Sequence, residues 1–200
     1  MATIRIPAPQ LYQALGNVAP HASKDDTLPV LCMLRLTVKA GGACVLEATD
    51  RYTLGEASFA ATADSEAGVI FIPVKAVPAI MKLCKGFPGA EAVLTLGPAQ
   101  DTLTIQVVDS TTVGAVQSFT FPDTTRLWPE PSAKISGGEA IGMNPANLCK
   151  FAKMYGPDFR PLKNVHLSYT PYALKPAPVT VHDLDNFRAI VMPVRLPSAS

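Results

Sequence analysis

The sequence predicts an α+β fold in which one pattern occurs three times. Each copy opens with a short strand, continues through one amphipathic helix and ends with three segments in which apolar and polar residues alternate. Such a repeat sets the whole topology. The chain has 200 residues, of which 48% are hydrophobic and 16% charged, so it is long enough to bury a sizeable core. We therefore expect three strand-helix-three-strand modules.

The first module is expected over residues 1–67, with a strand at 3–6 and a helix at 9–18. Apolar residues at spacings of three and four predict the helix. Asp50 lies in the last turn of this module, where an Asx-type backbone cap is favoured over a catalytic carboxylate. Three strands with period-two alternation follow the helix, at residues 34–38, 44–48 and 53–60.

The second module is expected over residues 68–128, with a strand at 69–73 and a helix at 74–85. The clearest alternation in the chain is Leu103, Ile105 and Val107 against polar neighbours. Its strands are expected at residues 92–96, 102–108 and 115–121.

Prolines and small residues between 122 and 138 indicate a boundary. We predict one complete two-module domain over 1–128, a linker at 129–137 and a half domain over 138–200. The third module is expected to contain a strand at 139–143, a helix at 145–155, and strands at 165–169, 179–182 and 187–196.

No residue pattern in the sequence supports a cofactor, a metal site or catalysis. The nucleotide-binding, hydrolase and metalloprotease motifs are missing from the sequence, and its three histidines are scattered. A cofactor-free hydrolase stays formally open. The cysteines have no C-x-x-C spacing and are interpreted as reduced core residues, at Cys32, Cys44, Cys84 and Cys149.

The net charge of +1 and the pI near 7.7 mean that nucleic-acid binding would need local basic patches. The first residues have no leader pattern, and no apolar run approaches the roughly 18 residues of a membrane span. We expect a cytoplasmic protein without membrane contact.

Four segments resemble the bacterial beta sliding clamp, the DNA polymerase III beta subunit. They are Leu-Pro-Val-Leu at 28–31, Ala-Thr-Asp-Arg-Tyr-Thr-Leu at 48–54, the stretch from Phe-Pro-Asp to Leu at 121–127, and Ile-Val-Met-Pro-Val-Arg-Leu at 190–196. The resemblance implies the sliding-clamp fold and a non-enzymatic role in replication. Residues 1–128 resemble the middle domain of a clamp and 138–198 half of its last domain. This reduced size favours a phage or mobile-element gene.

In that family, the early turn and the last strand meet to wall a groove for short peptide motifs of polymerases and clamp loaders. Here Arg51-Tyr52 stands where Gly-His is common in relatives. Alternation alone would make Ile190 and Met192 ordinary strand residues, and the resemblance favours the groove. The implied walls are Val30, Thr49, Arg51, Tyr52, Leu54, Pro122, Leu127, Ile190, Met192 and Pro193.

Lysines at outward helix positions are candidates for contact with duplex DNA. Spacings of three put pairs of them on one helical face, where they would meet phosphates without reading sequence. Solvated helix surface is the plainer reading of any single lysine. The DNA-facing candidates are Lys24, Lys75, Lys82, Lys85, Lys150 and Lys153.

Known clamp rings contain twelve modules, so three modules per chain imply a homo-oligomer of four chains. Because neighbouring modules alternate in direction, an odd number per chain turns each neighbour over. We expect third-to-third and first-to-first contacts in a dihedral tetramer. The alternative is a clamp-like interaction protein that forms no ring and binds clamp-binding peptides, and so modulates or inhibits host replication.

Overall fold

The computed structural model describes residues 3–63, 68–97, 102–115, 119–128, 142–156, 158–169 and 176–194. The α-helices are α1 (Ala8–Val18), α2 (Val77–Gly86) and α3 (Pro145–Leu148). The strands are β1 (Thr3–Pro7), β2 (Met33–Val38), β3 (Ala43–Thr49), β4 (Thr53–Ala60), β5 (Thr62–Ala63), β6 (Gly68–Pro73), β7 (Glu91–Leu96), β8 (Thr102–Val107), β9 (Ser110–Ala115), β10 (Leu167–Tyr169), β11 (Ala177–Val181) and β12 (Phe187–Val191). The short 3₁₀ helices are η1 (Ala19–His21), η2 (Pro29–Cys32), η3 (Val74–Ala76), η4 (Thr125–Leu127) and η5 (Cys149–Phe151).

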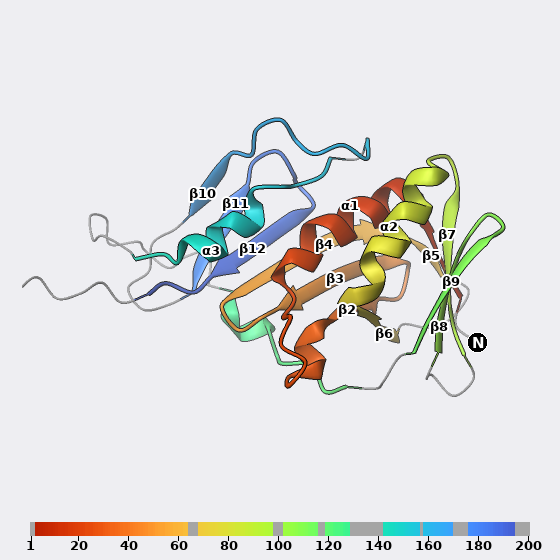
Figure 1. The fold of residues 1–200 in the computed structure, drawn as a ribbon, viewed down its shortest axis with the longest axis horizontal. Coiled ribbons are helices and arrows are strands. Elements are labelled where there is room, and N and C mark those ends of the chain that lie inside the picture. Colours follow the sequence, from red (N-terminus) through yellow and green to blue (C-terminus); the bar gives the residue numbers. More distant parts are fainter. Residues whose placement is uncertain are drawn as a thin grey trace, which may run out of the picture.

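The strands form two antiparallel sheets, and helices α1 and α2 pack against one face of each (Figure 1). The five-stranded sheet has the order β5-β1-β7-β8-β9, and the seven-stranded sheet has the order β10-β11-β12-β4-β3-β2-β6. Helices α1 and α2 lie side by side, with α1 against the seven-stranded sheet and α2 against β8 and β9. The predicted α+β class is confirmed.

The third helix is much shorter than the predicted span of 145–155. Its α-helical part ends at Leu148 and one 3₁₀ turn continues to Phe151. Asn17 of α1 explains the end, because its side chain accepts from the Tyr155 amide at 2.7 Å and donates to the Tyr155 carbonyl at 3.1 Å. These backbone groups are therefore used across the fold and not within a longer helix.

The strand predicted at 115–121 is wrong, because β9 covers Ser110–Ala115. A two-residue turn at 108–109 reverses the chain, and Val107 pairs with Ser110 directly across it. Val108 has a φ of 54°, a left-handed conformation that glycine or asparagine normally occupies in such turns. A valine there gives the sequence no turn signal.

Strands β12 and β4 join the third module to the first within one sheet. Their register pairs Ile190 with Leu54 and Arg188 with Glu56. We call this β4–β12 pairing the module joint. Because β12 already pairs with β4, the expected first-to-first contact cannot form through this strand. The strands at the ends of the two described sheets are β5 and β9 in one sheet, and β10 and β6 in the other.

The two faces of the seven-stranded sheet differ in chemistry. The helix face carries the buried core, including Leu36 and Leu46. The opposite face, here called the outer face, carries a row of charged residues paired across neighbouring strands. The row is Arg35, Glu47, Glu56 and Arg188.

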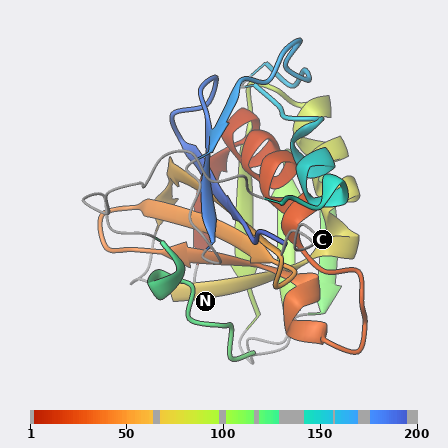
Figure 2. The same ribbon diagram turned by 90° about the vertical axis from the view of Figure 1, so that its left-hand side faces the viewer.

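Residues 119–128 cross this outer face and are called the crossing segment (Figure 2). Phe121 lies under the Arg35 guanidinium at 4.6 Å, and the Thr124 hydroxyl donates to Glu47 at 2.7 Å. Trp128 stacks under Arg188 at 3.9 Å. The predicted linker at 129–137 lies outside the described residues, as does most of the strand predicted at 139–143.

The four cysteines are free thiols, as expected, but they are not all core residues. Cys44 and Cys84 are buried, and burial raises the pKa of the Cys84 thiol to about 12. Cys32 is half-buried and Cys149 is exposed. None of the helices in the described ranges is long and apolar enough to span a bilayer.

Candidate functional site

A hollow of about 160 Å³ opens at the module joint. The β3–β4 turn forms one wall, and β12 with the residues after it forms the other. The crossing segment adds a leucine. The lining residues are Thr49, Arg51, Tyr52, Thr53, Leu54, Leu127, Pro176, Ile190 and Met192.

The β3–β4 turn is held by local hydrogen bonds. Asp50 Oδ1 accepts from the amides of Tyr52 at 3.1 Å and Thr53 at 2.8 Å, which confirms the predicted Asx-type cap. The Thr49 hydroxyl donates to the Thr53 carbonyl at 2.7 Å. Arg51 takes the left-handed conformation, with a φ of 78°. Glycine adopts that conformation more readily than arginine.

Strand β12 lies beside this turn, as the family resemblance implied. The Met192 amide donates to the Tyr52 carbonyl at 2.8 Å, one step beyond the Val191–Thr53 pair. Tyr52 is 55% exposed and Met192 36% exposed. Large side chains from the first and third modules therefore stand on either side of an open, mostly apolar hollow.

The structure brings together most of the predicted groove residues. The exceptions are Val30, which packs partly buried against the core, and Pro122 and Pro193, which do not line the hollow. Thr53 and Pro176 line it without having been predicted. Thr53 lies inside the 48–54 motif, whereas nothing in the sequence marks Pro176. The seven predicted residues in the lining are Thr49, Arg51, Tyr52, Leu54, Leu127, Ile190 and Met192.

The crossing segment delivers Leu127 to the hollow. The Thr124 carbonyl accepts from the Leu127 amide at 3.1 Å, which closes η4. Trp128 then stacks on Arg188, whose guanidinium also pairs with Glu56 at 2.7 Å. Contacts on both sides of Leu127 thus fix it to the outer face of the joint.

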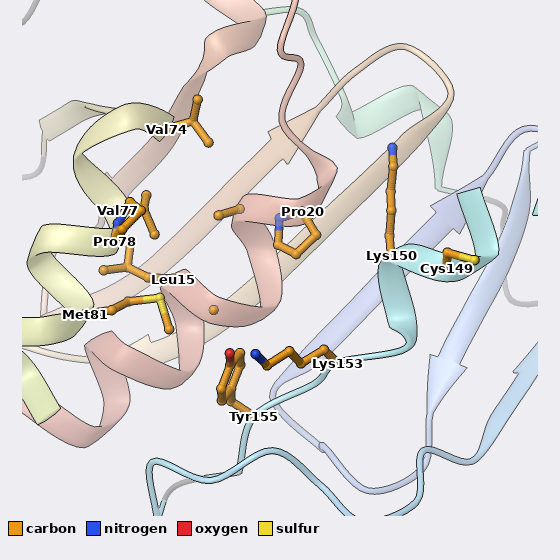
Figure 3. Close-up of a pocket in the computed structure, with 12 residues that line it drawn as sticks. Leu15, Pro20, Val74, Val77, Pro78, Met81, Cys149, Lys150, Lys153 and Tyr155 are labelled. Carbon is orange, nitrogen blue, oxygen red and sulfur yellow. The ribbon is translucent and has the colours of Figure 1, made fainter. Parts of the chain in front are cut away.

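A second hollow, of about 370 Å³, lies on the helix face (Figure 3). Its apolar floor comes from α1 and from the start of α2, including Leu15, Val77 and Met81. Lys153 and Tyr155 approach from the third module, with the ammonium 5.7 Å from the ring centre.

The DNA-facing candidates fall into different environments. Lys24, Lys82 and Lys85 are exposed, the last two on α2. Lys75 is also exposed and pairs with Asp26 at 3.1 Å. Lys153 is exposed beside the Tyr155 ring.

Lys150 departs from the expectation of an outward lysine. Its side chain is 16% exposed and forms an ion pair with Asp50 of the β3–β4 turn. The same ammonium donates to the Thr53 hydroxyl at 2.7 Å. Burial alone would raise the pKa of Asp50, but hydrogen bonds from Lys150 and the Thr53 amide outweigh burial and keep that pKa below its usual value.

The histidines do not form a reactive constellation. His21 is fully buried, and neither ring nitrogen has a hydrogen-bond partner among the described residues. His166 is exposed and pairs with Asp183 at 3.1 Å. Within the described ranges no group of His, Cys, Asp and Glu side chains could hold a metal ion.

Solved structures with the same architecture are bacterial sliding clamps. The sliding clamp (DNA polymerase III subunit beta) from Pseudomonas aeruginosa, bound to griselimycin, aligns with a TM-score of 0.72 and 16% identity over 97% of this chain and 65% of that chain. The DNA polymerase III beta subunit from Thermotoga maritima aligns with a TM-score of 0.74 and 15% identity over 98% of this chain and 66% of that chain. The DNA polymerase III beta subunit from Borrelia burgdorferi, in complex with a natural product, aligns with a TM-score of 0.77 and 10% identity over 98% of this chain and 64% of that chain.

These alignments establish the sliding-clamp fold that the sequence predicted. The chain spans less than two thirds of the length of those clamp chains. No model of a known protein family matches the sequence.

Proposed function

We propose that this protein is a DNA sliding clamp, a processivity factor without enzymatic activity that tethers a replicative polymerase to duplex DNA. The observation that carries the proposal is the open hollow at the module joint of a sliding-clamp fold. Its apolar lining consists of leucine, isoleucine, proline, tyrosine and methionine side chains, which pack around varied apolar anchors. Arg51 is exposed and supplies a charged group at the rim. The ligand is a short extended peptide with a glutamine and bulky apolar anchors, as carried by polymerases and clamp loaders.

Peptide capture tests the groove directly. Met192→Asp places a charge in one wall, and Tyr52→Ala removes the large side chain of the opposite wall. The double variant should therefore lose binding of a fluorescent peptide with one glutamine and two leucine anchors. Phe87→Ala with Val69→Asp is the matched control, because both residues are exposed apolar side chains away from the hollow. Equal affinity of the groove variant and the control variant would refute the groove.

The ring is proposed as a tetramer of three-module chains. Its isologous contacts would be third module to third module and, through β9, second module to second module. Exposed lysines on the helix face would meet DNA phosphates in the hole, giving sequence-independent and salt-sensitive contact. The candidates are Lys24, Lys82, Lys85 and Lys153, with Lys75 beside Asp26.

The runner-up function is a protein that uses the same groove without closing a ring. The hollow favours this candidate, because residues of a single chain line it and no ring is needed to form it. Retention on circular but not linear DNA, together with the native mass, separates the two. A monomer that binds the peptide and is retained equally on circular and linear DNA would support the runner-up and exclude the clamp.

A further inference from the structure

Lys150 belongs to the third module, yet its ammonium ends in the β3–β4 turn of the first module. Figure 3 shows the side chain rising from η5 towards the β3–β4 hairpin. It donates to Asp50 Oδ2 and to the Thr53 hydroxyl, the latter at 2.7 Å. Lys150 does not line the 160 Å³ hollow, so it would not touch a bound peptide.

A chain of hydrogen bonds leads from this ammonium to the walls of the hollow. Asp50 Oδ1 accepts from the Tyr52 and Thr53 amides, at 3.1 Å and 2.8 Å. The Tyr52 carbonyl in turn accepts from the Met192 amide at 2.8 Å. Each link fixes the backbone that presents a lining side chain.

The turn needs this support because it holds a conformation that its sequence disfavours. Arg51 has a φ of 78°, a region in which a non-glycine residue persists only when its surroundings fix it. The Asp50 side chain is 18% exposed and the Lys150 side chain 16% exposed, so water screens their attraction little. Without the ammonium, Asp50 would keep a poorly hydrated charge, and the turn would gain by opening towards water.

We propose that Lys150 is a positioning residue of the peptide groove, which sets the β3–β4 turn from the third module and so holds Arg51 and Tyr52 in the binding conformation. This role rests on the proposed function. A preformed wall spares the peptide the entropy of ordering it, so loss of Lys150 weakens binding without removing a contact. A compact ammonium suits the task because it serves two oxygens at once.

Three variants separate positioning from charge. Lys150→Met keeps the aliphatic stem and should weaken binding of the same fluorescent peptide about tenfold, mainly through faster dissociation. Lys150→Arg restores the charge with a different geometry and should recover most of the affinity. Lys153→Met is the control, because Lys153 is an exposed neighbour that does not reach the turn.

A double-mutant cycle with Tyr52→Ala distinguishes positioning from general destabilisation. If Lys150 acts through the turn, Lys150→Met should change affinity less than about twofold once Tyr52 is absent. Losses that simply multiply, or a Lys150→Met protein that binds like wild type, would overturn the proposal.

Hydrogen exchange of the ligand-free protein gives a readout that needs no peptide. Lys150→Met should speed exchange of the Tyr52 and Thr53 amides, which donate to Asp50, and leave the Ile105 amide in β8 unchanged. If the wild-type chain does not bind the peptide, the proposed function fails, while exchange at these amides still decides whether Lys150 sets the turn. Unchanged exchange would overturn that assignment.

Discussion

Among the described residues one ion pair crosses the module joint on each face of the sheet, and the two pairs differ in the burial of their cations. On the helix side Lys150 meets Asp50, with side chains 16% and 18% exposed. On the outer side Arg188 meets Glu56, with side chains 55% and 11% exposed. Both pairs connect the third module to the first. Their environments predict that the helix-side pair controls stability and the outer pair mainly orients the crossing segment.

The surroundings of the two pairs strengthen the contrast. The outer guanidinium lies over Trp128 at 3.9 Å, with one side open to water. Beneath the helix-side pair lies His21, packed against the rings of Phe151 and Phe187 at 5.2 Å and 6.0 Å. The surroundings of His21 on the helix side of the joint are therefore shielded from water, and an added charge or atom there should cost far more than one on the outer face.

The largest expected effect is the pH dependence of this shielded side. Burial, then the Lys150 charge, lower the pKa of His21 to about 3, against an opposing effect of Asp50. The unfolded chain takes up a proton near pH 6.5 that the folded chain refuses, so stability is full above that pH and is lost as pH falls. The free energy of unfolding, measured with a denaturant, should fall by about 1.4 kcal/mol for each unit that the pH is lowered between 6.5 and 3.

His21→Leu should remove this slope and cost little at pH 8, because neither ring nitrogen has a partner to lose among the described residues. His166→Asn, at an exposed histidine, should keep the slope. A slope that survives His21→Leu would place the titrating group elsewhere.

The next effect is steric. A Cβ at Gly55 would come within 2.4 Å of His21 Cδ2, and both residues are enclosed by the joint. Gly55→Ala should therefore destabilise the fold by about 3 kcal/mol in chemical unfolding. Gly86→Ala is the control, because nothing lies within 4 Å of a Cβ added there. Equal stability of the two variants would mean that the helix side of the joint is loosely packed.

Periodicity was enough to predict β2, β3 and β8, because burial of one face of a sheet imposes alternation on its strands. The Asx-type cap at Asp50 was also predictable, because the amides that donate to it lie within three residues. The position of β12 beside the turn came from the family resemblance and not from alternation.

What the sequence could not predict depends on distant partners or unusual backbone. Asn17 ends the third helix from 138 residues away, and Val108 forms a turn without a turn residue. The spacing of Lys150 and Lys153 predicts that both face outward, yet Lys150 pairs with Asp50, which lies 100 residues away in the sequence. Helical spacing identifies a face but not what covers it.

The smallest expected effect compares the two ion pairs themselves. Lys150→Met leaves Asp50 poorly hydrated and unpaired, so unfolding by denaturant at pH 7 should show a loss of about 2 kcal/mol. Arg188→Met removes a guanidinium from a side chain that is 55% exposed, so water can take its place beside Glu56, and the substitution should cost about 1 kcal/mol or less. Added salt should weaken the outer pair more than the helix-side pair, because the Arg188 side chain is 55% exposed and the Lys150 side chain 16% exposed. Equal losses from the two substitutions would show that burial does not distinguish the two faces, and the helix-side pair would lose its special role in holding the turn.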